Sequence, residues 1–339
     1  AMDYLLSHSV GKDNITLGFY GGEPLLRMDI LKYCIEYMES QVQDRRILFT
    51  LTTNGTLLTD DIIEYFIAHN VALFISLDGT KETHDRNRKF VNGHGSFDIV
   101  MWNVAHIKER YPEYFKTIYF NTVISPEMDM KCVRDYYSAD EVLATANFTS
   151  STIQEFYTDD PPQYDDRLYI DSQYGEFKAL LICAGRLSAK DMPFIYQGDI
   201  SDIRKLQENL HTDFLLPSAY HHGGPCIAGS RRLFVDVAGN FYPCERVSES
   251  SETMKIGSLE EGLNLEKVLN LINVGKITEN ECKRCWALVH CRICAAWADN
   301  LTGLDKSKKL QACPLYKSSV LHRFKNVCAL SQFTHHKIK

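Results

Sequence analysis

The 339 residues carry 37 Lys and Arg against 44 Asp and Glu, a net charge of −7, and 45% of them are hydrophobic. This composition suffices for a large α/β domain with a smaller second one, and without a basic stripe it argues against nucleic acid as a partner. No apolar run approaches the roughly 18 residues of a membrane span, and the N-terminus lacks the order of a signal peptide. We therefore expect a cytoplasmic protein without a membrane partner, in which eleven cysteines favour metal ligation or redox chemistry over disulfides.

Short apolar runs alternate with amphipathic stretches from residue 15 to about residue 155. The pattern predicts strands over 15–20, 47–52, 71–77 and 118–124, and helices over 25–41, 60–69, 96–110 and 129–137, with a loop over 79–95. Such alternation is typical of parallel βαβ units, closed as a barrel or open as a doubly wound sheet. Two further helices are expected over 172–187 and 200–210.

The first residues have a helical period without a capping residue ahead of it. Apolar residues stand at positions 2, 5, 6 and 10, directly from the start of the chain. We therefore expect a further segment upstream of Ala1.

A glycine-containing motif follows each of the first three expected strands. These motifs are "YGGEP" (20–24), "TTNGT" (52–56) and "SLDGT" (76–80). Glycine and asparagine serve strand-to-helix turns in any case. Three such turns in succession, each with a carboxylate, hydroxyl or amide beside the glycine, predict a polar ring around one small-molecule site at the carboxyl ends of the strands.

The cysteines fall into a dense set and a scattered set. Because free cysteine is among the most buried residue types, we expect the scattered ones to fill the core; these are Cys34, Cys132, Cys183 and Cys328. The other seven lie between residues 226 and 313, namely Cys226, Cys244, Cys282, Cys285, Cys291, Cys294 and Cys313.

The dense set contains two C-x2-C pairs, each of which holds two thiolates on one tight turn. One alternative is a single zinc ribbon, which leaves three of the seven cysteines without a role; its ligands would be Cys282, Cys285, Cys291 and Cys294. The other is a pair of [4Fe-4S] clusters, which uses all seven and leaves one position for a histidine, water or substrate. Spacing alone favours neither metal.

Together these motifs resemble radical SAM enzymes with a SPASM domain, through "YGGEP", "TTNGT", "SLDGTKETHDRNR" (76–88), "GSF" (95–97) and the seven cysteines. The resemblance covers residues 15 to about 125 and 226 to about 315. It implies an α/β fold with a partial (β/α)6 barrel that lacks its first strand over residues 1–155. Connecting helices that complete the barrel then occupy 156–225, and a SPASM domain with a C-terminal helix occupies 226–339. The implied cofactors are S-adenosylmethionine (SAM) and [4Fe-4S] clusters, two of them auxiliary.

The resemblance also implies which strand-end residues bind SAM. The Gly-Gly-Glu turn corresponds to the segment that grips the methionine amino group, where a carboxylate pairs with an ammonium and glycine permits close approach. The asparagine and serine positions correspond to contacts with the ribose or the carboxylate, and the aspartate is a further candidate. These residues are Gly21, Gly22, Glu23, Asn54, Ser76 and Asp78.

By the same resemblance, the seven cysteines divide between a distal and a proximal cluster. The distal ligands are Cys282, Cys285, Cys291 and Cys313, and the proximal ligands are Cys226, Cys244 and Cys294. Relatives usually show C-x5-C-x3-C, whereas two residues separate the last pair here. His221 and His222 are the nearest upstream groups to the proximal fourth position, which can also stay open for a substrate thiolate.

One motif of the family is missing from this sequence. The C-x3-C-x2-C segment that binds the SAM-cleaving cluster has no counterpart at that spacing. The uncapped first helix and the missing motif share one explanation, an N-terminally shortened radical SAM enzyme that does not itself cleave SAM. We expect the coding sequence upstream of Ala1 to supply the motif.

The resemblance implies a peptide substrate and a reductant such as flavodoxin or ferredoxin. The likeness is strongest to maturases of cysteine-rich ribosomal peptides that form thioether bridges, and an alternative is a sulfatase maturase that forms formylglycine. Glu245 stands where sulfatase-maturating relatives carry an acidic residue proposed as a base, and its alternative role is a surface salt bridge with Arg246. A third possibility is a non-catalytic, metal-stabilised peptide-binding or electron-transfer module.

Overall fold

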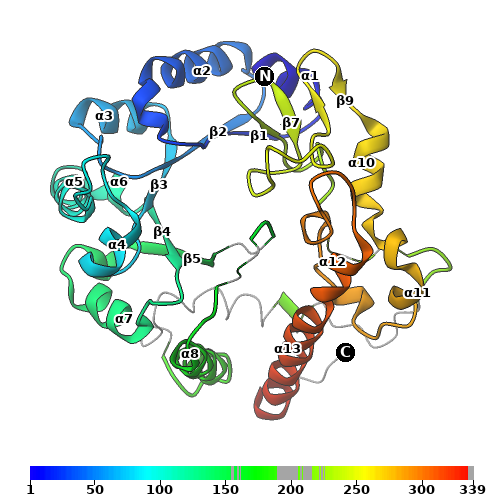
Figure 1. The fold of residues 1–339 in the computed structure, drawn as a ribbon. Coiled ribbons are helices and arrows are strands. Elements are labelled where there is room, and N and C mark those ends of the chain that lie inside the picture. Colours follow the sequence, from blue (N-terminus) through cyan, green and yellow to red (C-terminus); the bar gives the residue numbers. More distant parts are fainter. Residues whose placement is uncertain are drawn as a thin grey trace.

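The computed structural model describes residues 1–153, 156–158, 160, 162–188, 205–206, 208, 216–220, 222, 224 and 226–334. Most of the helix expected over 200–210 lies outside these residues, as does His221. The chain forms two lobes around separate hydrophobic cores, drawn on opposite sides of Figure 1. We call them the sheet lobe and the cysteine lobe. The boundaries at residues 155 and 225 stay predictions.

Five parallel strands form the sheet lobe. In spatial order they are β1 (Asn14–Phe19), β2 (Arg46–Thr53), β3 (Val71–Ser76), β4 (Tyr119–Ile124) and β5 (Asn147–Thr152). Each strand pairs with the next one along the chain, so the carboxyl ends of all five lie at one edge. The expected α/β fold is confirmed, as an open sheet in the described residues rather than a closed barrel. The fifth strand was not predicted.

Helices connect the strands, as the pattern indicates. They are α1 (Met2–Ser7), α2 (Met28–Gln41), α3 (Asp60–Ala68), α4 (Lys81–Asn87), α5 (Phe97–Arg110), α6 (Pro112–Phe115), α7 (Met130–Ala139) and α8 (Asp166–Cys183), with short 3-10 turns at Pro24–Arg27 and Leu143–Thr145. Side chains begin two of them, since Asp129 accepts from the Cys132 amide and Asp165 from that of Arg167. The loop expected over 79–95 is wrong in part, because α4 lies within it.

The core of the sheet lobe follows from the alternation along its strands. In β3 every second residue is buried, with Leu73 and Ile75 fully so. Phe120 of β4 joins them, and the buried face of α2 and α3 contributes Ile35 and Phe66. This packing holds the strand ends at fixed positions.

The cysteine lobe has little regular structure. Its antiparallel sheet consists of β6 (Phe234–Val235), β7 (Asn240–Tyr242), β8 (Gly257–Ser258) and β9 (Gly262–Leu263). There follow α10 (Leu265–Ile272), α11 (Glu279–Cys282), α12 (Lys306–Gln311), the long α13 (Cys313–Thr334) and 3-10 turns at Val274–Thr278, Leu288–His290 and Ala295–Trp297. Phe241, Met254 and Ile256 are the fully buried centre of its core.

Among the described residues, the lobes contact each other at opposite ends of the molecule. At one end the Tyr4 ring of α1 lies 4.7 Å from that of Phe241 in β7, while Leu5 packs on the sheet lobe (Figure 1). At the other end Glu176 of α8 hydrogen-bonds His322 and Asn326 of α13. Of the helices in the described ranges, none is long and apolar enough to cross a membrane.

Candidate functional site

The three glycine-containing motifs lie side by side, because β1, β2 and β3 are neighbours in the sheet and each motif follows one of them. Gly21 and Gly22 are exposed after β1, and no atom lies within 4 Å of a Cβ built on either. Gly21 has a φ of +140°, a conformation that favours glycine. The backbone of this turn is therefore open to a ligand.

Glu23 links the first motif to the second. Its Oε1 accepts hydrogen bonds from Thr53 Oγ1 at 2.7 Å and from the Leu25 amide at 3.1 Å, and its Oε2 accepts from the Asn54 amide at 2.7 Å. Each carboxylate oxygen offers two lone-pair sites, so Oε2 keeps room for a further donor. The side chain is half-buried and held in place at the sheet edge.

Asn54 and Gly55 shape the turn after β2. Asn54 Oδ1 accepts from both the amide and the hydroxyl of Thr56, which closes an Asx turn. Gly55 has a φ of +78°, and a Cβ there would lie 2.9 Å from Ile75. Asn103 of α5 donates to the Gly55 carbonyl at 2.8 Å, so the turn is fixed from the helix side as well.

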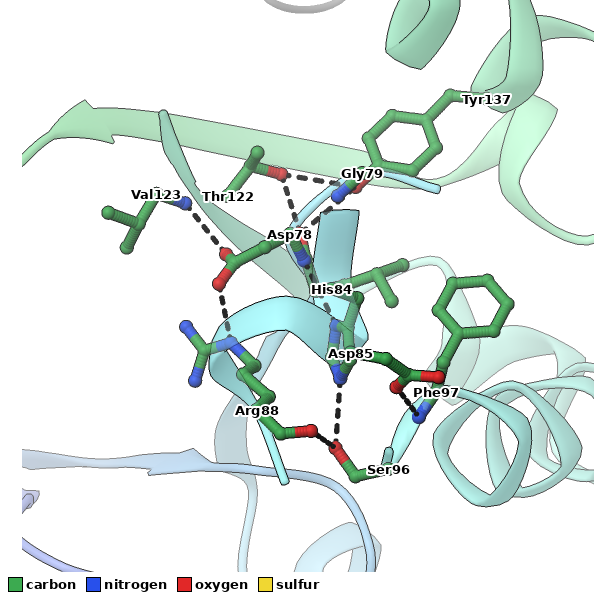
Figure 2. Close-up of polar contacts among 11 residues, drawn as sticks. Asp78, Gly79, His84, Asp85, Arg88, Ser96, Phe97, Thr122, Val123 and Tyr137 are labelled. Atoms are coloured by element: carbon green, nitrogen blue, oxygen red, sulfur yellow. Dashed lines mark hydrogen bonds and ion pairs between the residues drawn. The ribbon is translucent and has the colours of Figure 1, made fainter. Parts of the chain in front are cut away.

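Asp78 lies just beyond the end of β3, and both of its carboxylate oxygens have partners (Figure 2). Oδ2 accepts from Arg88 Nε at 2.6 Å, and Oδ1 accepts from the Val123 amide of β4 at 2.8 Å. The carboxylate therefore positions a guanidinium, and its predicted contact with SAM stays a prediction. Ser76, the last residue of β3, lies opposite Asn121 of β4 and is half-buried.

Arg88, directly after α4, is a residue near the strand ends that the sequence interpretation did not single out, although its motif was quoted. It lines an open cavity of about 320 Å³ together with Asp78, Ser125 and Ile153. Its Nη atoms make no hydrogen bond with the side chains that the structure describes. The sequence signal for this residue was the ten-residue separation of Asp78 and Arg88, because α4 lies between them and brings the two side chains into an ion pair.

His84 is the buried centre of the motif between β3 and α5 (Figure 2). Its Nδ1 accepts from the Asp78 amide at 3.2 Å, and its Nε2 lies 3.0 Å from Ser96 Oγ, whose hydroxyl donates to the Arg88 carbonyl. This arrangement requires the neutral tautomer with its proton on Nε2. Burial agrees, since it lowers the pKa of His84 to about 4.

Tyr137 of α7 supports the same motif from the other side of Figure 2. Its hydroxyl accepts from the Gly79 amide at 2.7 Å and donates to the Leu77 carbonyl at 2.9 Å. Burial raises the pKa of this phenol, which keeps it protonated. Gly79, at φ +82°, leaves no room for a Cβ beside Val133.

In the cysteine lobe, four thiols interact with one another. Cys291 interacts electrostatically with Cys282 and Cys313, and Cys313 interacts also with Cys285. A turn from the Cys285 amide to the Cys282 carbonyl, at 3.0 Å, brings one C-x2-C pair together. Burial raises the pKa of the Cys291 and Cys313 thiols. These four are the residues predicted for the distal cluster.

The other three thiols form a second group. Cys294 interacts electrostatically with Cys244 and Cys226, and burial raises its pKa. Gly224 allows its backbone to pass close to Ile293, the residue before Cys294, because a Cβ at Gly224 would lie 2.3 Å from the Ile293 carbonyl oxygen. His222 is buried beside the group, with Nε2 3.0 Å from the same oxygen. The predicted proximal ligands therefore share one region.

Soft thiol donors on half-buried turns suit an iron–sulfur cluster in their chemistry. All eleven cysteines are free of disulfides. Within the described ranges, no three His, Cys, Asp or Glu side chains lie close enough to hold a single ion. The ligand assignments stay predictions.

The remaining predicted residues are placed as follows. Glu245 is paired with Arg232, whose Nη1 lies 3.1 Å from Oε1, and Arg246 lies 3.8 Å away, so the salt-bridge alternative describes its surroundings and its role as a base stays a prediction. The prediction of core filling is wrong for Cys132 and Cys328, which are exposed because they lie on outward faces of α7 and α13.

The sequence is similar to a known protein family and to characterised proteins. Residues 2–138 match the model of the Radical SAM superfamily. A cysteine-type anaerobic sulfatase-maturating enzyme of Clostridium novyi is 34% identical over 105 residues, which are 30% of this chain and 28% of the relative. A radical SAM cyclopropyl synthase of Paramaledivibacter caminithermalis is 23% identical over 328 residues, 92% of this chain and 61% of the relative. The chain thus spans less than two thirds of either relative.

Solved structures share the fold. The structure of anSMEcpe with bound AdoMet has a TM-score of 0.66 at 18% identity and covers 96% of this chain and 88% of its own. The same protein with AdoMet and the Kp18Cys peptide has a TM-score of 0.62 at 17% identity, over 95% and 89%. At this identity the likeness concerns the fold alone.

Proposed function

We propose that the protein is a radical SAM enzyme that modifies a peptide or protein, a proposal that the match of residues 2–138 to the model of the Radical SAM superfamily supports. One observation carries the proposal: the same chain has open polar turns at the carboxyl ends of β1 to β3, which we call the strand edge, and seven thiols in two groups. The first suits SAM, and the second suits two auxiliary [4Fe-4S] clusters. The names of the relatives, a sulfatase-maturating enzyme among them, support a peptide or protein substrate.

In this proposal the strand edge holds SAM. The open turn at Gly21 and Gly22 lets the backbone approach the methionine part, and Glu23 accepts its ammonium on the free site of Oε2. Asn54 and Ser76 face the ribose or carboxylate. Asp78 acts through Arg88, whose guanidinium suits a carboxylate. When bound and reduced, SAM would supply the 5′-deoxyadenosyl radical that takes a hydrogen atom from a substrate.

The first product that we propose is a thioether crosslink in a cysteine-rich peptide. One C–H and one S–H bond of the substrate are replaced by one C–S bond. The hydrogen atom would leave with the adenosyl group of SAM, the thiol proton would go to a base, and the clusters held by the seven cysteines would take up the remaining electron and return it to the reductant, such as flavodoxin or ferredoxin. Glu245 is the candidate base, and it would have to part from Arg232 to act.

A second candidate is the oxidation of a Cys or Ser side chain to formylglycine. The relatives that support it are the cysteine-type enzyme of Clostridium novyi and a serine-type sulfatase-maturating enzyme of Bacteroides thetaiotaomicron, 36% identical over 97 residues. The Bacteroides match covers 28% of this chain and 23% of the relative. Both candidates use the same strand edge and differ in the product.

The test is an anaerobic assay of the complete gene product with SAM, a reductant and either a cysteine-rich precursor peptide or a sulfatase peptide, followed by mass spectrometry. We expect the precursor to lose two hydrogens per crosslink and its modified cysteine to resist alkylation. Formylglycine in the sulfatase peptide would support the second candidate instead. Glu23→Gln should lower product formation at least tenfold, whereas Glu36→Gln, on the exposed face of α2, should not. Unchanged peptides with an enzyme that cleaves SAM would contradict both.

Iron analysis of this chain separates the enzyme from a non-catalytic module. About eight irons per chain support two auxiliary clusters. One or two zinc ions instead would support a structural module.

A further inference from the structure

Lys309 is a buried cation beside the first thiol group. It lies on α12, is only 2% exposed, and its ammonium is 2.6 Å from Thr278 Oγ1 and 3.9 Å from Cys282 Sγ. The Cys313 thiol in turn lies 3.8 Å from the Lys309 carbonyl. The side chain therefore ends among the thiols and not in solvent.

The ammonium has no carboxylate beside it in the described part of the chain. It forms no ion pair there, and Glu281, whose charge it affects, is paired with Lys306 at 2.6 Å instead. A buried charge normally has a counter-charge or a metal centre next to it. The hydroxyl of Thr278 supplies only a neutral acceptor. Among the described residues the charge of Lys309 therefore lacks a carboxylate partner, and it lies beside the Cys282 sulfur.

The positive charge lies against one of the predicted distal ligands, because Lys309 Nζ is 3.9 Å from Cys282 Sγ. The second group differs, because Lys308, the neighbouring residue on α12, donates instead to the carbonyls of Phe156 and Asp299. Of these two lysines of α12, Lys309 therefore places its ammonium beside a thiol, whereas Lys308 hydrogen-bonds backbone carbonyls.

We propose that Lys309 is the internal counter-ion of the metal cluster held by Cys282, Cys285, Cys291 and Cys313, and that it raises the reduction potential of that cluster. The inference rests on the proposed function, since it assumes a thiolate-bound cluster there. Such a cluster is negatively charged and becomes more so on reduction, so a fixed cation in a poorly solvated site stabilises the reduced form. Lys309 is a positioning residue and touches no substrate.

The experiment compares the chain, reconstituted anaerobically with iron and sulfide, with three variants. Lys309→Met removes the charge and keeps much of the volume, and Lys309→Arg keeps the charge. Lys283→Met is the matched control, because Lys283 lies between two of the cysteines but is 69% exposed on its side chain and paired with Glu279. Iron content is measured first. The potential of the cluster signal that Cys313→Ala abolishes is then measured by redox titration with electron paramagnetic resonance.

We expect Lys309→Met to lower the ratio of reduced to oxidised cluster at least tenfold at a fixed potential, equivalent to about 59 mV for a one-electron couple. In Lys309→Arg and Lys283→Met, the ratio of reduced to oxidised cluster at that potential should change less than threefold. Should Lys309→Met fail to hold this cluster, retention by Lys309→Arg supports the inference, and equal loss in both overturns it. Equal potentials in Lys309→Met and the unchanged chain also overturn it.

The proposed function fails separately, at the first measurement. A chain that takes up no iron–sulfur cluster contradicts the proposed clusters before any variant is compared. A chain with about eight irons and no effect of Lys309→Met leaves the proposed clusters standing and removes only the role of Lys309.

Discussion

The two candidate sites of this molecule are built in different ways. At the strand edge of the sheet lobe, Glu23, Asp78 and His84 have hydrogen-bond partners within the protein, on strands and helices with a large core. In the cysteine lobe, the seven thiols stand on loops and at the ends of helices, beside a sheet whose strands have two or three residues.

The two sites differ in what holds their side chains in place: hydrogen bonds within the protein at the strand edge, and, by our proposal, a bound metal cluster at the thiols. The strand edge is held by the protein alone, so it exists before a ligand binds. In the described part of the chain no hydrogen bond joins one of the seven thiols to another, and burial raises the pKa of the Cys294 thiol. A bound metal cluster replaces thiol protons by metal bonds, so it adds stability to one lobe and none directly to the other.

The largest expected effect is that of removing the metal. We expect an anaerobically reconstituted chain to lose stability in the cysteine lobe on chelation, by on the order of 10 kcal/mol of metal-binding free energy. Amide hydrogen exchange measured before and after chelation should accelerate in β7 and around residues 282–294, and stay unchanged in β2 and β3. Equal acceleration in both lobes would contradict the separation of the sites.

Acidification should act on the sheet lobe through His84. Its pKa falls from 6.5 to about 4 in the fold, so the folded protein binds the proton more weakly than the unfolded chain. The stabilisation is complete above about pH 6.5 and is lost progressively as the pH falls toward 4, up to about 3 kcal/mol in total.

The measurement is amide exchange in β3 and β4 between pH 7 and pH 4, corrected for the intrinsic rate. The contribution should disappear in His84→Gln, which has no proton to bind in this range. It should remain in His94→Gln, a change at an exposed residue of the same motif. A pH dependence that survives in His84→Gln would assign the effect to other groups.

The smallest expected effect is that of a single hydroxyl. Tyr137→Phe leaves the buried Gly79 amide without its 2.7 Å acceptor, which should cost about 1 to 3 kcal/mol. Tyr136→Phe is the control, because its half-buried hydroxyl meets Asp140 at 3.3 Å and its loss should cost under about 1 kcal/mol. Chemical denaturation of both variants checks the order, which equal costs would contradict.

Periodicity alone predicted most of the sheet lobe. The apolar runs of β1 to β4 and the amphipathic pattern of α3 and α5 mark elements whose one face is buried. α4 was missed because its only buried side chain is His84, so "KETHDRN" carries no apolar period. β5 was missed because "NFTSST" is polar and mostly exposed, as the edge of a sheet allows.

The sites were predictable to different depths. Motif spacing located the three strand-end turns, because parallel neighbours bring their carboxyl ends together. It did not show that Arg88 holds Asp78, since that contact depends on the missed α4. In the cysteine lobe the spacing alone left a zinc ribbon and two clusters as alternatives, and the division into two thiol groups came from the resemblance, whereas Lys309 was invisible as one lysine in "KSKK".

The contacts between the described residues of the two lobes have a mechanical consequence. They lie at opposite ends of the molecule, one through the Tyr4 and Phe241 rings and the other through Glu176 with α13 (Figure 1). A body attached at a single point can swivel in any direction, whereas one attached at two distant points can turn only about the line that joins them. Rotation of the cysteine lobe about any other axis therefore requires the release of one attachment.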